Sequence, residues 1–422
     1  MTRLLRTTAF LILALACEDP AIGQGLDLQS DVGIEAQFRS HSPSAQSELQ
    51  RKAPFEIIRS MRALQDQIVL GSTQAQAAMP KLAGQIAELF LAADSQAWVD
   101  TKNARAAIVY TLSGGQPRVA RKILETGNCP ELERTLLEAA LAYVDGNDVK
   151  AKQLLNKIEP KTLPATVAGQ VALVKAALMV HTDPEKAMEL LDFARIVAPG
   201  TLVEEAALRR EIFLSDEIND FSRFIRLASQ YIRRFQNSVY ADNFHQRFAK
   251  SVVHCGVASD VVQFAKLDKL LSEVRPDNRL SLYLSIAQSG ITAGKINAAR
   301  FAAERAASLA NSGTIEDMRA RLYEGVALIL TQEFEEGLAK IRSVDTAHLA
   351  ERDAELAKAI EDVSAQIVDP AHDLQAELGP EPPQSAAISS PNSSAGQSAS
   401  ALIDLAQGTL VATNALLKRN AP

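Results

Sequence analysis

Turn signals recur between apolar segments at nearly constant spacing, and this recurrence restricts the chain to a repetitive helical architecture. The signals are the glycine-containing, amide or acidic turns at Gly115, Asn147, Asp183, Glu217, Gly256, Gly294 and Gln332. They lie 32 to 39 residues apart, with an average of about 36. A period in this range is typical of stacked helical hairpins of the tetratricopeptide type. The sequence therefore predicts an all-α fold, an α-solenoid of tetratricopeptide-like hairpins over residues 54–366.

Individual units show the same helical pattern. Asp183-Pro184 supplies a helix N-cap followed by proline at the first helical position. The apolar residues that follow are spaced i, i+3, i+4 and i+7, which is the pattern of an amphipathic helix. Further on, residues 298–306 carry five alanines on one predicted helix face, which lets a neighbouring helix approach closely. No strand pattern of comparable strength occurs in the sequence.

The first 23 residues have the features of an export signal. Two arginines precede the apolar run of residues 9–16, which is shorter than the roughly 20 residues that a membrane-spanning helix needs. Ala21-Ile22-Gly23 is a small-x-small cleavage site. We therefore predict cleavage after Gly23 and a periplasmic protein with no transmembrane span in its mature chain. The alternative is a lipoprotein with its lipid on Cys17, since residues 14–17 weakly resemble a lipoprotein box.

Three further segments flank the predicted helical body. Residues 24–53 form a polar leader. Residues 367–400 are rich in proline and serine, which predicts a flexible linker. Residues 401–422 have the apolar spacing of a short amphipathic helix, which either caps the solenoid or binds a partner groove.

The overall charge and the cysteines exclude two classes of protein. The net charge is −7, whereas a general nucleic-acid-binding protein needs a strongly basic surface. Beyond the signal only Cys129 and Cys255 remain, too few for a fold held by disulfides. We expect no bridge between them, because distant units of a solenoid do not touch. The apolar residues, 47% of the chain, must hold the fold together.

No motif predicts catalysis, a cofactor or a small-molecule substrate. Residues 112–116 spell LSGGQ, the signature of ABC-type ATPases, but such enzymes also need a P-loop. The nearest candidate, residues 290–296, is one residue short and has Ile296 where a Mg²⁺ ligand is required. We interpret LSGGQ as the turn of a helical hairpin. His254-Cys255 is a close pair of possible metal ligands, but no third ligand accompanies it, so we predict no metal site and no enzyme.

The segment from Pro199 to Lys250 carries the strongest local signals. Thr201 and Glu204 occupy the N-cap and N3 positions of a capping box. Glu205 and Arg209 are spaced to form an i,i+4 pair, which we expect on an exposed helix face.

The second half of this segment is aromatic and basic. Between Phe221 and Lys250 lie seven aromatic and six basic residues against one acidic residue, Asp242. In one interpretation Phe221, Phe224, Tyr231 and Phe235 fill a hairpin interior and the arginines form a solvated face. In the other, arginine and tyrosine side chains, which are enriched at binding hot spots, engage an acidic partner. The candidate partner-binding residues are Arg223, Arg226, Tyr231, Arg233, Arg234, Tyr240 and Arg247.

Several stretches resemble the MotC family, periplasmic motility proteins of rhizobium-like α-proteobacteria. They are residues 109–124, 142–148 and 183–195, together with residues 200–214 and 231–249. The resemblance is best over residues 54–260. It implies a periplasmic accessory of the flagellar motor that is required for rotation and acts with MotB, the stator subunit that grips the cell wall. The alternatives from other classes are an exported scaffold or lipoprotein in cell-envelope assembly and a peptidoglycan-active enzyme.

Overall fold

The computed structural model describes residues 52–256 and 261–368, and every regular element within them is a helix. The first helices of successive pairs are α2 (Pro54–Val69), α4 (Thr101–Leu112), α6 (Glu131–Val144), α8 (Ala165–Met179), α10 (Leu202–Glu217), α12 (Ala241–His254), α14 (Pro276–Thr292), α16 (Ile315–Ile329) and α18 (Glu351–Val368). The second helices are α3 (Thr73–Ala92), α5 (Pro117–Thr126), α7 (Asp148–Leu155), α9 (Pro184–Val197), α11 (Phe221–Phe235), α13 (Val261–Leu271), α15 (Ile296–Leu309) and α17 (Phe334–Arg342). Short 3-10 turns lie at η2 (Ser95–Val99), η3 (Pro160–Thr162) and η5 (Thr346–His348).

The prediction of an all-helical fold is thus confirmed for these residues. The predicted signal peptide with Cys17, most of the polar leader, nearly all of the linker and the C-terminal helix lie outside the described residues. The described residues as far as Ser364 belong to one compact unit.

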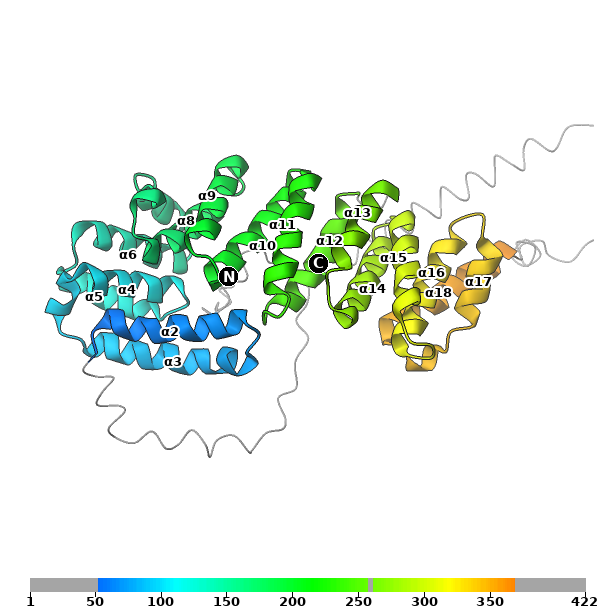
Figure 1. Ribbon diagram of the computed structural model, residues 1–422, viewed down its shortest axis with the longest axis horizontal. Helices are drawn as coiled ribbons and strands as arrows, with labels where there is room; N and C mark the ends of the chain where they lie inside the picture. The colour runs from blue at the N-terminus through cyan, green and yellow to red at the C-terminus, as the bar shows by residue number, and fades with distance from the viewer. Residues whose placement is uncertain (1–51, 257–260, 369–422) are drawn as a thin grey trace, which may run out of the picture. The chain divides into compact units, whose positions relative to one another are not determined.

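Consecutive helices pack as hairpins, which Figure 1 shows in chain order from α2 to α18. Contacts join α2 to α3, α4 to α5, α6 to α7, α8 to α9, α10 to α11, α14 to α15 and α16 to α17. All seven predicted turns fall at or next to the junction between the two helices of a pair. The positions of these hairpins, predicted from the turn residues, are therefore confirmed.

The LSGGQ segment is one of these junctions, as predicted. Helix α4 ends at Leu112, Gly114 has a positive φ of 86°, and α5 begins at Pro117. A Cβ atom on Gly115 would lie 2.4 Å from the ring of Tyr110, so only glycine fits there. The Tyr110 hydroxyl accepts a hydrogen bond from the backbone N–H of Gln116 at 3.0 Å and donates one to the carbonyl of Ala83 at 2.9 Å. Tyr110 therefore links the turn to α3 through its ring and its hydroxyl group.

The N-cap predicted for α9 is present in the structure, whereas the capping box predicted for α10 is not. Asp183 Oδ1 accepts from the backbone N–H of Lys186 at 3.0 Å, and Pro184 is the first helical residue, as predicted. At α10 the expected capping box does not form. The Thr201 side chain caps no N–H and instead donates to the Ala198 carbonyl at 2.7 Å, while Glu204 accepts from the N–H of Gly200. The proline-glycine turn places Gly200, not Thr201, within reach of that carboxylate.

Small residues bring α14 and α15 into close contact, as the alanine pattern predicts. Five of the six alanines of α15 are at most 2% exposed: Ala298, Ala299, Ala302, Ala303 and Ala306. A Cβ atom on Gly290 of α14 would lie 2.8 Å from the backbone nitrogen of Ala299. The two backbones therefore meet at Gly290, and the segment that resembled an imperfect P-loop is a helix crossing.

Replacing Gly290 by alanine is expected to destabilise the protein, although alanine favours a helix. The added methyl group meets backbone, which cannot move aside as a flexible side chain can, so we expect a loss of about 1–3 kcal/mol in a denaturant titration. Gly84 in α3 is the matched control, since nothing lies within 4 Å of a Cβ atom there. Gly84→Ala should stabilise by about 0.5–1 kcal/mol. Equal effects of the two changes would contradict the close crossing.

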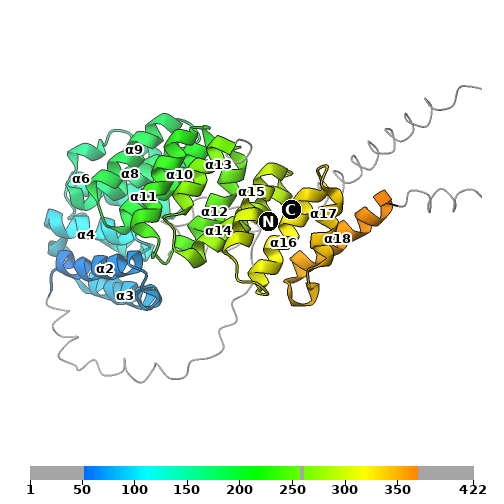
Figure 2. The same cartoon turned by 45° about the vertical axis from the view of Figure 1, so that its right-hand side comes forward.

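The first five hairpins make contacts between units that are distant in sequence. Helix α2 contacts both α4 and α10, and α8 likewise contacts both α4 and α10. Figures 1 and 2 both show α2 beside α4. The N–H of Val239 donates to the carbonyl of Ile68 at 3.3 Å, although 171 positions separate these residues. The premise that distant units do not touch is therefore wrong for this part of the chain, although Cys129 and Cys255 are both free thiols.

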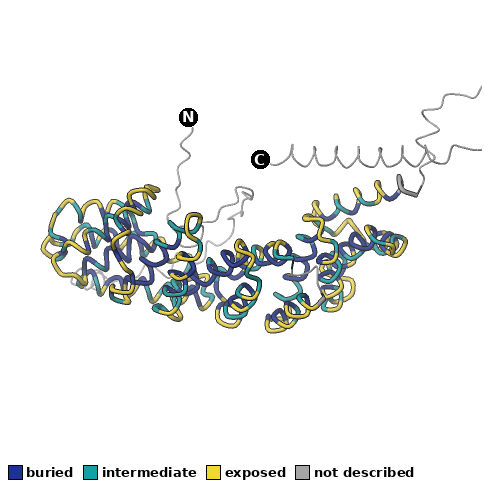
Figure 3. The backbone as a smooth tube through the Cα atoms, turned by 90° about the horizontal axis from the view of Figure 1, so that it is seen from above, coloured by how far each residue is buried: buried dark blue, intermediate teal, exposed yellow. Residues whose placement is uncertain are grey.

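Apolar side chains form the interior along the whole described body. One buried cluster extends from α2 to α8, a second joins α8, α9 and α10, and the largest extends from α10 to α18. In Figure 3 exposed positions gather at turns and outer helix faces, while buried positions follow the interior. Of the helices described, none combines the length and the apolar character that crossing a membrane requires.

Candidate interaction site

The aromatic residues of the predicted binding segment form core, as one of the two interpretations proposed. Phe224, Tyr231, Phe235, Phe244 and Phe248 are at most 2% exposed, and Phe221 packs against them while half-buried. The ring centroids of Tyr231 and Phe244 lie 3.8 Å apart, and those of Phe224 and Phe248 lie 5.4 Å apart. These stacked rings join α11 to α12. Tyr231 therefore has no surface to offer a partner.

A buried polar group lies beneath these rings. The Tyr231 hydroxyl donates to Glu205 Oε1 at 3.0 Å, and Glu205 is 0% exposed. Burial raises the pKa of Glu205, and the nearby Arg209 guanidinium opposes that rise. Arg209 is itself only 6% exposed and lies over the half-buried Tyr240 ring at 4.9 Å. The expectation that Glu205 and Arg209 pair on an exposed face is therefore wrong, because this face of α10 is covered by α11 and the turn before α12.

Arg223 belongs to a charged cluster between α9, α10 and α11. Its Nη2 lies 2.9 Å from Oε1 of Glu211 and 3.0 Å from Oδ2 of Asp192. Arg195 Nε lies 3.4 Å from the other Glu211 oxygen. Glu211 is 0% exposed, so burial and then the neighbouring Asp192 raise its pKa, while the two arginines lower it. Arg223 therefore serves mainly to neutralise a buried carboxylate.

Two more of the candidate arginines are exposed but already paired. Arg233 makes a two-pronged contact with Glu273, at 2.6 and 2.8 Å. Nη2 of Arg234 lies 2.8 Å from Oε2 of Glu204, a carboxylate whose side chain is 4% exposed. Both acids come from other helices or turns than α11. The excess of positive charge that the sequence shows in this segment is therefore reduced by acids from elsewhere in the chain.

Arg247 of α12 is held by an aromatic ring. Its guanidinium lies 4.1 Å from the centroid of the Phe213 ring, and its Nη2 is 3.9 Å from Oε1 of Glu217. A guanidinium over a ring face is attracted by the ring quadrupole. Arg247 therefore links α12 to α10 and is only half-exposed.

Arg226 differs from the other candidates. It is exposed on α11, and its side chain makes no hydrogen bond or ion pair with any residue that the structure describes. It lies seven positions before Arg233, so both project from the same outward face of the helix, opposite the buried stripe that contains Phe224 and Tyr231. On α12, Lys250 is likewise exposed and without a described partner. Arg226 and Lys250 are thus the basic residues of this segment that remain available to an acidic group.

His254 and Cys255 meet a single carboxylate. His254 Nδ1 and Cys255 Sγ each lie 2.8 Å from Asp216 Oδ1. Burial, followed by this hydrogen bond, raises the pKa of the Cys255 thiol. Burial also raises the pKa of Cys129, to about 11. Both thiols are therefore protonated at neutral pH, and no group of three possible metal ligands occurs among the described residues.

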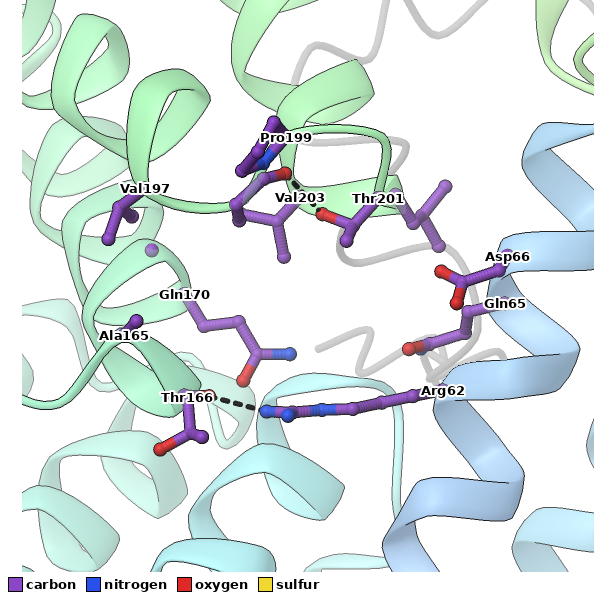
Figure 4. A pocket seen from close by; sticks show the side chains of 13 residues that line it. Arg62, Gln65, Asp66, Ala165, Thr166, Gln170, Val197, Pro199, Thr201 and Val203 are labelled. Atoms are coloured by element: carbon purple, nitrogen blue, oxygen red, sulfur yellow. Dashed lines mark hydrogen bonds between the residues drawn. The ribbon is translucent and has the colours of Figure 1, made fainter.

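A cavity that the sequence did not indicate lies where α2, α8 and the start of α10 face one another. Its volume is about 330 Å³. The lining residues are Arg62, Gln65, Asp66, Ala165, Thr166, Gly169, Gln170, Val197, Ala198, Pro199, Thr201, Leu202 and Val203. Figure 4 shows Arg62 reaching from α2 across the floor towards Thr166, and Gln170 pointing inward from α8. No motif could have revealed it, since its walls come from segments more than 90 residues apart.

The sequence of the chain is similar to those of known chemotaxis proteins. A family model described as Chemotaxis protein MotC matches residues 2–422. A protein of Rhizobium meliloti (strain 1021) named Chemotaxis protein MotC is 30% identical over 319 residues. That alignment covers 75% of this chain and 73% of the relative. The family match therefore includes the helical body, the basic face of α11 and the cavity.

Proposed function

The chain belongs to the MotC family of chemotaxis proteins, and on that basis we propose that it supports flagellar rotation by binding another protein of the motor. The resemblance of its sequence to this family implies the partner, the stator subunit MotB, and a periplasmic location. In this proposal the chain reaches the periplasm through its N-terminal signal, which is cleaved after Gly23. It acts without catalysis.

The proposed mode of action is that of a helical-repeat scaffold. Pairs of helices stacked as tetratricopeptide-like units present an extended surface from rigid elements. Such a surface can hold the periplasmic part of a stator protein in one conformation. Binding shifts the stator between states only if the two states differ in their affinity for the scaffold.

The observation that carries the proposed binding surface is the outward face of α11. It carries Arg226, exposed and without a described partner, two helical turns from the exposed Arg233. Arginine is enriched at binding hot spots, and a basic face favours an acidic partner. Lys250 on α12 is another exposed basic residue whose side chain has no described partner. The proposed surface does not rest on the remaining candidates, because each of them already contacts a residue of α10: Arg223, Arg234, Arg247 and Tyr240.

Reversing the charge of Arg226 tests this surface. Arg226→Glu should weaken partner binding by about 30-fold, since a hot-spot arginine contributes about 2 kcal/mol and the new carboxylate repels an acidic partner. Swimming in soft agar should fall accordingly. Folding stability should change by no more than about 0.5 kcal/mol, because the side chain is exposed and has no described hydrogen-bond or ion-pair partner.

The matched control is Arg59→Glu, which reverses an exposed arginine on α2 that also has no described partner. It should leave swimming unchanged. Arg234 is unsuitable for this test, because its loss would leave the buried Glu204 carboxylate without its guanidinium. If Arg226→Glu cells swim as the Arg59→Glu cells do, the outward face of α11 does not bind the partner.

A further inference from the structure

The cavity between α2, α8 and α10 has the size of a small-molecule site. Its volume of about 330 Å³ lies at the lower end of the range of about 300–1,000 Å³ found for ligand pockets. One wall is apolar and contains Val197, Leu202 and Val203. The two valines pack tightly against Gly169 of α8. A Cβ atom on this glycine would lie 3.0 Å from Val203 Cγ1 and 3.2 Å from Val197 Cγ1. The opposite wall, from α2, carries the charged groups.

A buried hydrogen-bonding group faces this space without a partner. Gln170 is 6% exposed, and its Nε2 donates to Ser113 Oγ at 3.0 Å. Its Oε1 is buried and accepts no hydrogen bond. Figure 4 shows the side chain reaching into the cavity from α8, with its amide oxygen turned towards the floor along which Arg62 lies. A buried acceptor without a donor costs free energy, so a bound N–H group at this position would be stabilising.

The α2 wall offers one positive and one negative group that are not paired with each other. The half-buried Arg62 guanidinium donates to the carbonyl of Thr166, a neutral acceptor. It makes no ion pair with a described carboxylate, and the exposed Asp66, one helical turn further along α2, attracts it only at longer range. A guanidinium whose only acceptor is a backbone carbonyl retains donors that suit a carboxylate.

From these groups we propose that the cavity binds a free α-amino acid in its zwitterionic form. The carboxylate pairs with Arg62, and the ammonium group donates to Gln170 Oε1 and faces the Asp66 carboxylate. The side chain packs against Val197 and Val203. The sequence predicted no small-molecule ligand, because these residues come together only through the contacts of α2 with α10 and of α8 with α10.

The balance of charge selects this class of ligand over singly charged ones. A simple anion would satisfy Arg62 but would meet the carboxylate of Asp66. A simple cation would satisfy Asp66 but would meet the guanidinium of Arg62. A molecule that carries both charges a few bonds apart pairs with both groups and leaves neither opposed. The inference does not depend on the proposed role in motility.

Calorimetric titration of the purified mature protein tests the proposal. Each of the natural L-amino acids is titrated singly, and at least one should bind with a Kd below about 10 mM, which corresponds to weak but specific binding. The best of them is then compared with its N-acetyl derivative, which lacks the ammonium group, and with its amide, which lacks the carboxylate. Each derivative should bind at least about 10-fold more weakly, the loss expected for one hydrogen-bonded charge.

Two variants complete the test. Arg62→Gln should weaken binding of the same amino acid at least about 10-fold. Arg59→Gln, which removes an exposed arginine three positions earlier on α2, should bind it as the wild type does. Circular dichroism melting verifies that both variants are folded. The proposal is overturned if no amino acid binds, if either derivative binds as tightly as the parent, or if Arg62→Gln binds normally.

Discussion

Replacing Arg223 by alanine should lower the free energy of unfolding by about 3 kcal/mol, at the lower end of the cost of breaking a buried ion pair. The change leaves Glu211, which is 0% exposed, beside the Asp192 carboxylate with only Arg195 to neutralise it. An unpaired buried charge costs more than the pair contributed, because the carboxylate has already lost its hydration. Denaturant titration of the purified variant measures the effect.

Arg226→Ala is the matched control, on the same helix and three positions away. Because that side chain is exposed and has no described partner, its loss should change stability by less than about 0.5 kcal/mol. A second substitution, Glu211→Gln, should restore part of the stability of Arg223→Ala, since a neutral amide needs no counter-charge. Additive effects of the two substitutions would contradict the buried pair.

The cost of Arg223→Ala should also depend on pH. Burial and the neighbouring Asp192 already raise the pKa of Glu211, and losing Arg223 raises it further. A carboxyl group with a raised folded-state pKa binds its proton more tightly in the folded protein, so stability falls as the pH rises through that pKa. The difference in stability between variant and wild type should therefore shrink when the pH is lowered from 7 to about 5.

The hairpins could be predicted because their signals are local. Gly115 is followed by a proline that starts α5, and Asp183 caps α9 through the N–H three residues later. Such contacts lie within a few positions of one another, so the sequence itself displays them. The aromatic core of α11 was predictable for the same reason, since the buried residues repeat with helical spacing along 15 consecutive positions.

The charged surface could not be predicted, because its neutralising partners lie on other segments. Arg223 contacts Asp192, 31 positions away, and Arg233 contacts Glu273, 40 positions away. Arg234 contacts Glu204, 30 positions away. Each acid lies outside the window in which the basic residues were counted. A run of arginines therefore indicated a basic surface larger than the one that α11 presents.

The cavity was missed for a geometric reason. Its existence depends on how far successive hairpins turn, and hence on the contact of α2 with α10, which a regular turn spacing does not specify. The turn after α2 also meets a distant segment, the turn between α11 and α12 that contains Asn237. A Cβ atom on Gly71 would lie 2.3 Å from the carbonyl oxygen of Asn237, so the contact depends on a glycine in a turn that the 36-residue series did not include.

The proposed role in motility predicts a complete loss of swimming when the gene is deleted in frame. A motor accessory acts after the flagellum is built, so the deleted cells should still carry filaments. Expression of the wild-type chain from a plasmid should restore swimming, and expression of the Arg226→Glu chain should restore much less. These outcomes follow from a function in rotation and not from one in filament assembly.

The most direct measurement is therefore rotation itself, observed in tethered deletion cells whose filaments have been verified by electron microscopy. The proposal predicts filaments of normal number and length that do not turn, with rotation recovered on expression of the wild-type chain. Deletion cells that rotate and swim as the parent strain does would contradict the role in motility. Cells without filaments would instead place the protein in flagellar or envelope assembly.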